Sequence, residues 1–184
     1  RINILLIAIS KLDKFPNLKL QLVGDGGERE RLERQASLLG ISDRVEFLGH
    51  VTDQELAGFY ESCTVFVMPS IAELQSIATM EAMASGRPVI AADAMALPHL
   101  VHDGDNGYLF PPDDADALKQ RLELVLSADE KELARLSENS LHLIQSHDIA
   151  TTITIFEDLY RGTGADVPTT ADNRPEYFLP IGRL

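Results

Sequence analysis

The stretch TVFVMPSIAELQSIATMEAMASGRPVIAA, residues 64–92, contains two short apolar segments separated by a helical pattern. Residues 64–70 and 87–92 are apolar on both faces and include β-branched side chains, which predicts two buried strands. Residues 75–86 between them have the apolar spacing of a helix. A strand, a helix and a second strand in this order indicate part of a parallel α/β sheet that is covered on both faces.

The same alternation extends in both directions from this stretch. Residues 1–12 combine β-branched content with helical spacing, and we expect a helix there because only Phe15, Pro16 and Asn17 separate them from the next strand. The fold class that this pattern predicts is a doubly wound, Rossmann-like α/β domain with a parallel sheet and helices on both faces. The other predicted strands are 18–24, 44–49 and 106–110, and the other predicted helices are 27–40, 53–62, 114–127, 129–146 and 149–161.

Composition narrows the class of protein. A length of 184 residues is enough for one domain with a sizeable core. The net charge of −13 argues against a nucleic-acid partner, because binding to phosphate backbones needs a cationic face. The single cysteine, Cys63, excludes an internal disulfide framework. No apolar run approaches the roughly 18 residues of a membrane span and no signal peptide is visible, so we expect a cytoplasmic setting.

A glycine-rich segment, VGDGGERERLE at residues 23–33, lies between a predicted strand and a predicted helix. Gly24 and Gly26 allow the backbone to approach a ligand, and the start of the following helix favours anions. Ligands of open α/β sheets bind at this carboxyl end of the strands. A tight turn without any ligand explains the glycines equally well. His50 follows the next strand and is a candidate contact at the same edge.

Two glutamates, Glu73 and Glu81, are separated by seven residues. A carboxylate can accept two hydrogen bonds at once, which suits the paired hydroxyls of a sugar ring. Glu73 is expected in a loop and Glu81 within the following helix, so that one could bind a hexose and the other a ribose of the same ligand. The alternative is that Glu81 is a solvated helix residue and Glu73 an acid in the first turn that favours the helix dipole. Three backbone amides between them, at the start of the helix, could bind a diphosphate: those of Gln75, Ser76 and Ile77.

The segment PSIAELQSIATMEAMASGRPVIA resembles the signature of family-four retaining glycosyltransferases, in which seven residues separate two glutamates and which have the GT-B fold. The resemblance covers about residues 1–161. One difference is Leu74, Gln75 and Ser76, where many members have glycine and an aromatic residue after the first glutamate. Other segments resemble successive parts of that family's C-terminal domain: PNLKLQLVGDGGERERLE, RVEFLGHV, ELAGFYESCTVFVMPS, PHLVHDGDNGYLFPPDDADAL and FEDLY.

The resemblance implies a site for a UDP- or GDP-linked sugar donor. Glu73 would contact the transferred sugar, Glu81 the nucleotide ribose, and Gly24 with its loop the diphosphate. No metal is expected, because an arginine and a lysine bind the donor diphosphate in that family. The family's acceptor-binding domain has no counterpart in this sequence. We therefore expect the donor-binding half of a hexosyltransferase without turnover of its own, with membrane association of the longer enzyme left open.

The two ends of the chain depart from the family order. In the family, the C-terminal domain begins with a strand that ends G-R-L, whereas in this chain IGRL is at residues 181–184. We predict a circular permutation, with residues 1–161 as the nucleotide-sugar-binding domain, 162–176 as a linker and 177–183 as the central strand between strands 18–24 and 64–70. Arg183 would then bind the diphosphate, and the family's lysine is absent.

Four alternatives stay open at this stage. Pro180 is unfavourable in a central strand. Residues 177–183 could instead complete a neighbouring copy in a swapped homodimer, or form a loose tail. The domain could also be an engineered or truncated binding module without activity. A nucleotide-sugar epimerase of the same fold is the fourth alternative.

Overall fold

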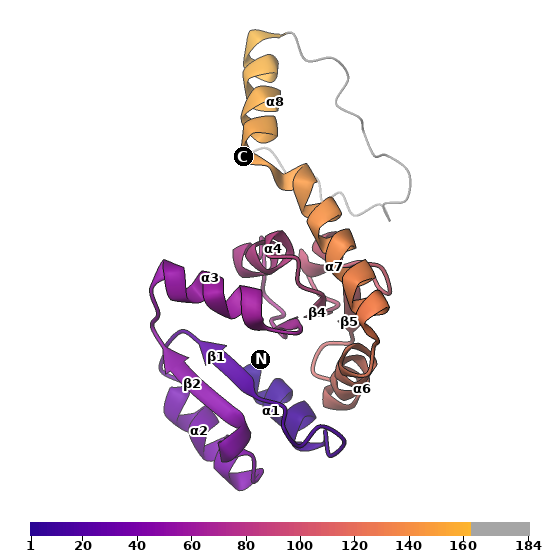
Figure 1. The fold of residues 1–184 in the computed structure, drawn as a ribbon. Coiled ribbons are helices and arrows are strands. Elements are labelled where there is room, and N and C mark those ends of the chain that lie inside the picture. The colour runs from indigo at the N-terminus through magenta and orange to yellow at the C-terminus, as the bar shows by residue number, and fades with distance from the viewer. Residues whose placement is uncertain (163–184) are drawn as a thin grey trace, which may run out of the picture. The chain divides into compact units, whose positions relative to one another are not determined.

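The computed structural model describes residues 1–162, whose elements alternate in the predicted α/β order (Figure 1). Each predicted strand up to residue 110 is present, so the α/β fold class is confirmed. The strands are β1 (Leu20–Val23), β2 (Val45–Gly49), β3 (Phe66–Met68), β4 (Val89–Ala92) and β5 (Gly107–Phe110).

The first segment is a helix, as predicted from its spacing. Two short 3-10 turns, Ser42–Arg44 and Gln145–His147, and the four-residue helix α5 were not predicted. The helices are α1 (Ile2–Ser10), α2 (Arg29–Leu38), α3 (Asp53–Ser62), α4 (Ile77–Ala84), α5 (Leu97–Leu100), α6 (Ala115–Leu126), α7 (Glu130–Ile144) and α8 (Ile149–Arg161).

Side-chain caps fix where several helices begin. At α3, the Thr52 hydroxyl accepts a hydrogen bond from the Glu55 amide at 3.3 Å, and the Glu55 carboxylate accepts one from the Thr52 amide at 2.8 Å. This reciprocal capping box satisfies two amides that the helix itself leaves unpaired. Asp114 is the N-cap of α6 and accepts hydrogen bonds from the amides of Asp116 and Ala117.

The chain divides into two compact units, residues 1–146 and 147–184. The first unit holds all the described strands. The described part of the second unit is α8, which begins at the N-cap Asp148 and ends at Gly162 in the left-handed conformation. The predicted strand 177–183, with Arg183, lies outside the described residues.

The strands of the first unit form two separate parallel sheets. β1 pairs with β2, and the other sheet has the order β3-β4-β5. Within residues 1–162, β1 and β3 therefore each have one edge without a neighbouring strand. This is the place that the sequence assigns to the central strand 177–183, which stays a prediction.

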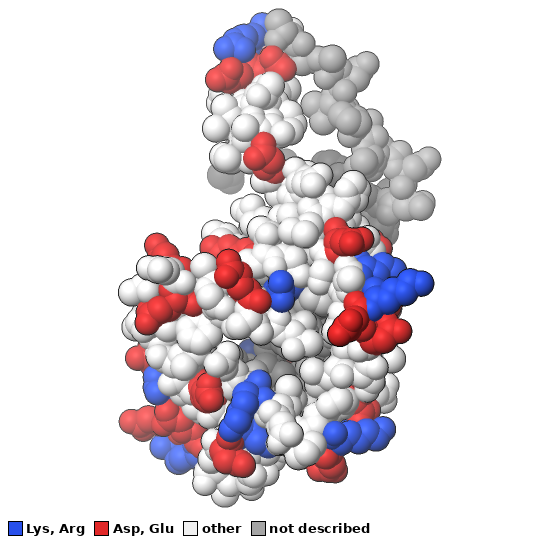
Figure 2. Space-filling view, viewed as in Figure 1, with Lys and Arg blue, Asp and Glu red and all other residues white. Residues whose placement is uncertain are grey.

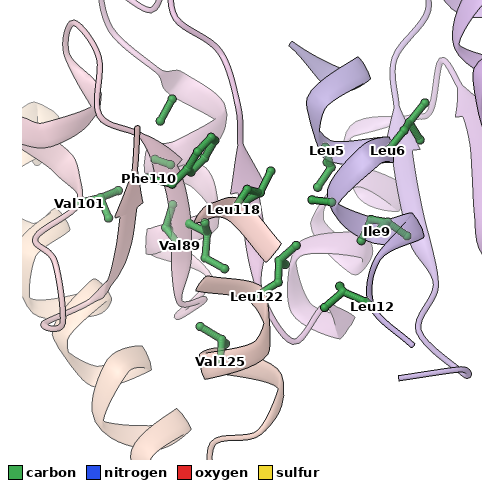
Figure 3. Close-up of a cluster of buried hydrophobic side chains, with 14 of the residues drawn as sticks. Leu5, Leu6, Ile9, Leu12, Val89, Val101, Phe110, Leu118, Leu122 and Val125 are labelled. Atoms are coloured by element: carbon green, nitrogen blue, oxygen red, sulfur yellow. The ribbon is translucent and has the colours of Figure 1, made fainter. Parts of the chain in front are cut away.

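Helix α1 joins the two sheets, because it packs against α2 on one side and against α6 on the other. Figure 3 shows Leu5 and Ile9 of α1, and Leu12 just after its end, facing the side chains of α6 across the core. Leu12 and Leu118 are completely buried. Burying a leucine side chain contributes about 1.5–3 kcal/mol, so the burial of these two leucines stabilises the packing between the two sheets.

Candidate functional site

The glycine loop begins where β1 ends. Gly24 has a φ of +111°, a backbone conformation that residues with a side chain rarely adopt. Its amide donates a hydrogen bond to the Gly49 carbonyl at 2.8 Å. This bond places the carboxyl ends of β1 and β2 side by side, and the exposed His50 follows directly after Gly49. The structure therefore brings the Gly24 loop and His50 to the same edge, as the sequence predicts.

A pocket of about 180 Å³ lies beneath this loop, lined by residues of α1, β1, β2 and α2 that include Gly24 and Gly26. Small-molecule sites are commonly about 300–1,000 Å³. The pocket is therefore large enough for part of a nucleotide sugar but not for the whole molecule. Neither Glu73 nor Glu81 lines it, so the common pocket for the two glutamates stays a prediction.

Arg29 is a cation at this pocket that the sequence analysis did not select. Its Nη2 donates to the Phe47 carbonyl at 2.9 Å, and the guanidinium lies 5.9 Å from the centre of the Phe47 ring. Its Nε is paired with the Glu33 carboxylate at 2.9 Å. These contacts tie α2 to β2. The only signal in the sequence is an arginine five residues after Gly24, in the first turn of a helix.

The loop that carries Glu73 follows β3. The backbone carbonyl of Glu73 accepts a hydrogen bond from the Ala96 amide at 3.1 Å, which fixes the loop against the start of α5. The side chain of Glu73 is half-buried. The structure thus holds the backbone of Glu73 while leaving the residue partly exposed.

The three predicted amide donors lie at the start of α4, as expected. Gln75 and Ile77 are exposed, whereas Ser76 is the N-cap residue and is buried. The Ser76 hydroxyl is 2.8 Å from the Thr79 hydroxyl, inside the domain. The Ser76 side chain is therefore occupied by an internal contact, and only its backbone amide suits the predicted anion site.

Glu81 lies within α4 and is exposed, but its carboxylate has a defined partner. The hydroxyl of Tyr60, on α3, donates to Glu81 Oε2 at 3.0 Å. Tyr60 is 8% exposed, and its ring packs edge-on against Phe66 with 5.7 Å between the ring centres. Burial, and then the bond to Glu81, raise the pKa of Tyr60, so its hydroxyl stays a donor at neutral pH. The sequence analysis did not select Tyr60.

Arg183, the remaining predicted site residue, lies outside the described residues. In the described part of the chain, no group of three or more potential ligands could hold a metal ion. None of the described helices is both long enough and apolar enough to cross a membrane. Acidic and basic side chains are interspersed on the face shown in Figure 2.

The elements that carry these residues match a known family along most of the chain. The family described as "Glycosyl transferases group 1" matches residues 1–142. The chain belongs to this glycosyltransferase family. Its relatives include a D-inositol 3-phosphate glycosyltransferase of Streptomyces bingchenggensis, 35% identical over 87% of this chain. A phosphatidyl-myo-inositol mannosyltransferase of Mycolicibacterium smegmatis is 34% identical over 94% of this chain.

Solved glycosyltransferase structures have the same fold. HepE of Anabaena, crystallised with UDP-glucose, has a TM-score of 0.77 at 30% identity, covering 86% of this chain and 44% of that one. Sucrose-phosphate synthase of Thermosynechococcus elongatus has a TM-score of 0.79 at 31% identity, covering 88% of this chain and 41% of that one. The chain spans 38% and 45% of the length of the two sequence relatives, so it corresponds to one part of a GT-B glycosyltransferase.

Proposed function

We propose that the chain is the donor-binding half of a retaining glycosyltransferase that transfers a hexose from a nucleotide diphosphate sugar. The observation that supports this is the arrangement around α4. Glu73 lies in an anchored loop before the helix, three backbone amides lie at its start, and Glu81 lies within it. One ligand with a sugar, a diphosphate and a ribose matches these groups in the same order.

The residues would act mainly by positioning the donor. Glu73 would hold the sugar, Glu81 would accept hydrogen bonds from the ribose hydroxyls, and the start of α4 and the Gly24 loop would surround the diphosphate. Departure of the diphosphate develops negative charge, which amides and Arg183 would stabilise without a metal. HepE, whose structures contain UDP and UDP-glucose, supports a nucleotide-sugar ligand for this chain as well.

The acceptor in this proposal binds to a separate domain. The chain alone would then bind the donor weakly and transfer sugar slowly or not at all. Two of the sequence relatives are named for inositol-containing acceptors, and we propose an acceptor that is a lipid or a small molecule.

Isothermal titration calorimetry with UDP and GDP tests this function. We expect one nucleotide to bind, and Glu81→Gln to weaken it about tenfold or more, since hydrogen bonds to a charged group contribute about 1.5–3 kcal/mol each. Glu138→Gln removes an exposed acid from α7 and is the matched control, expected to bind like the original chain. Binding of neither nucleotide would contradict the proposal. Epimerisation of the donor without an acceptor would favour the epimerase instead.

A further inference from the structure

The hydroxyl of Tyr60 is 3.0 Å from Glu81 Oε2, although the two residues lie on different helices and are 21 positions apart. Tyr60 is almost entirely buried, whereas Glu81 is exposed. An exposed glutamate on a helix normally exchanges between several rotamers, and fixing such a side chain costs up to about 2 kcal/mol. A buried tyrosine hydroxyl needs a partner, so the tyrosine favours the one rotamer of Glu81 that satisfies it.

Two groups of contacts hold the tyrosine itself. Its ring packs edge-on against Phe66 of β3, with an angle of 61° between the ring planes. Arg87, between α4 and β4, donates from Nη1 to the Cys63 carbonyl at the end of α3 and from Nε to the Ser85 carbonyl after α4. The guanidinium of Arg87 therefore ties the ends of the two helices together, which fixes the position of Tyr60 relative to Glu81.

The hydrogen-bonding capacity of the carboxylate leaves room for a ligand. A carboxylate has two oxygens and about four acceptor positions, and Tyr60 occupies one position on Oε2. Oε1 and the second position on Oε2 stay available to a pair of vicinal hydroxyls. Tyr60 is thus placed to orient the acid without competing for the whole of it.

We infer that Tyr60 is a positioning residue that holds Glu81 in the rotamer that binds the nucleotide ribose. This inference rests on the proposed function, because it assigns the ribose to Glu81. The competing explanation is structural: Glu81 merely satisfies the hydroxyl of Tyr60. The two explanations differ in what loss of that hydroxyl does to the recognition of ribose.

Tyr60→Phe removes the hydroxyl and keeps the ring, and calorimetry with the nucleotide that the chain binds measures the effect. We expect affinity for UDP or GDP to fall about three- to tenfold, equivalent to about 0.7–1.4 kcal/mol, while the affinity for inorganic pyrophosphate is unchanged. In a Glu81→Gln background the same substitution should have no further effect, because the acid that it orients is already altered. Tyr108→Phe on β5 is the matched control and should leave both affinities unchanged.

A ratio of two affinities separates a change in ribose recognition from partial unfolding of the variant. The ratio of the dissociation constants of the 2′-deoxy nucleotide and the ribonucleotide does not depend on the fraction of folded protein. We expect this ratio to fall toward one in Tyr60→Phe.

If Glu81→Gln weakens binding while Tyr60→Phe leaves both the affinity and the ratio unchanged, the positioning role is wrong and the proposed function stands. If Tyr60→Phe loses the same affinity for nucleotide and for pyrophosphate and the ratio is unchanged, the role of Tyr60 is structural. If the original chain binds no nucleotide, the proposed function itself fails.

Discussion

The two sheets differ in how completely their strands are buried. In the three-stranded region, residues 66–144, all four residues of β4 are completely buried. In the two-stranded region, residues 20–49, β1 alternates between half-buried and exposed residues, and Val23 is 41% exposed. Glu73 and Glu81 belong to the three-stranded region, which we call the buried region. The glycine loop belongs to the two-stranded region, which is more exposed.

The candidate ligand-binding residues of the two regions are held in place by different kinds of hydrogen bond. The acids are held by long-range bonds, to Ala96 for the Glu73 backbone and to Tyr60 for the Glu81 carboxylate. The glycine loop is held by one bond to Gly49, by the aspartate within it and by the local bond from the Arg29 amide to the Gly26 carbonyl. We therefore expect substitutions in the buried region to change stability most, and substitutions in the glycine loop to change it least.

The largest effect concerns the edges of β1 and β3 that have no neighbouring strand within residues 1–162. If residues 177–183 fill the space between β1 and β3, truncation after Gly162 removes the strand that joins the two sheets. Unfolding in urea should then lose its single cooperative transition, because two interior edges are exposed. An unchanged transition would contradict the permutation. A dimeric full chain that becomes monomeric on truncation would indicate exchange of the segment between copies.

Gly107→Ala should be the most damaging single substitution in the buried region. A Cβ at this position would lie 1.8 Å from the Val89 carbonyl oxygen, so β4 and β5 could not keep their pairing. We expect a loss of at least about 4 kcal/mol in the free energy of unfolding, measured in urea. Gly58→Ala on α3, where a Cβ meets nothing within 4 Å, is the control and should stabilise the domain by about 0.5–1 kcal/mol. Equal urea midpoints for the two variants would show that β5 does not pack as described.

Asn106→Ala should cost about 2–4 kcal/mol in the free energy of unfolding, because it leaves buried backbone groups without partners. The Asn106 side chain is completely buried, accepts from the His102 amide at 2.8 Å and donates to the Leu100 carbonyl at 3.0 Å. Chemical denaturation measures the loss. The exposed Asn17→Ala is the control, expected within about 0.5 kcal/mol of the original chain. A cost for Asn106→Ala no larger than that of the control would contradict the assigned role.

Gly24→Ala should have the smallest effect, about 1–2 kcal/mol in the free energy of unfolding, since its cost comes from the positive φ alone. No atom lies within 4 Å of the added Cβ. Gly26→Ala in the same loop has equal space and no positive φ, so it should change stability by less than about 0.5 kcal/mol. If Gly24→Ala costs as much as Gly107→Ala, the two regions do not differ as we describe.

Local patterns predicted most of the elements. Helix α3 begins and ends at the residues predicted from its apolar pattern, and the capping box of Thr52 and Glu55 fixes its start. Helix α5 was missed because its four residues are too few for a periodic pattern, and burial of Leu97 and Leu100 holds it in place. The two sheets are separated at the place that the sequence assigns to residues 177–183, and because these lie outside the described residues that assignment stays a prediction.

The candidate site was predictable only in part. Glu73, Glu81 and the glycine loop follow from residue type and spacing, and the structure locates them without testing their role. The contacts of Tyr60 with Glu81 and of Arg29 with Phe47 join residues far apart in sequence, so periodicity gives no sign of them. Arg183 as a phosphate ligand stays a prediction.

The central claim is that Glu73 and Glu81 bind two parts of one ligand, and calorimetry with a nucleotide and its sugar conjugate tests it most directly. UDP with UDP-glucose, or GDP with GDP-mannose, is titrated into the original chain, Glu73→Gln and Glu81→Gln. The account predicts that Glu81→Gln weakens nucleotide and sugar nucleotide equally, while Glu73→Gln weakens only the sugar nucleotide. If Glu73→Gln leaves the affinity for the sugar nucleotide unchanged while Glu81→Gln lowers it, the two acids do not share a ligand.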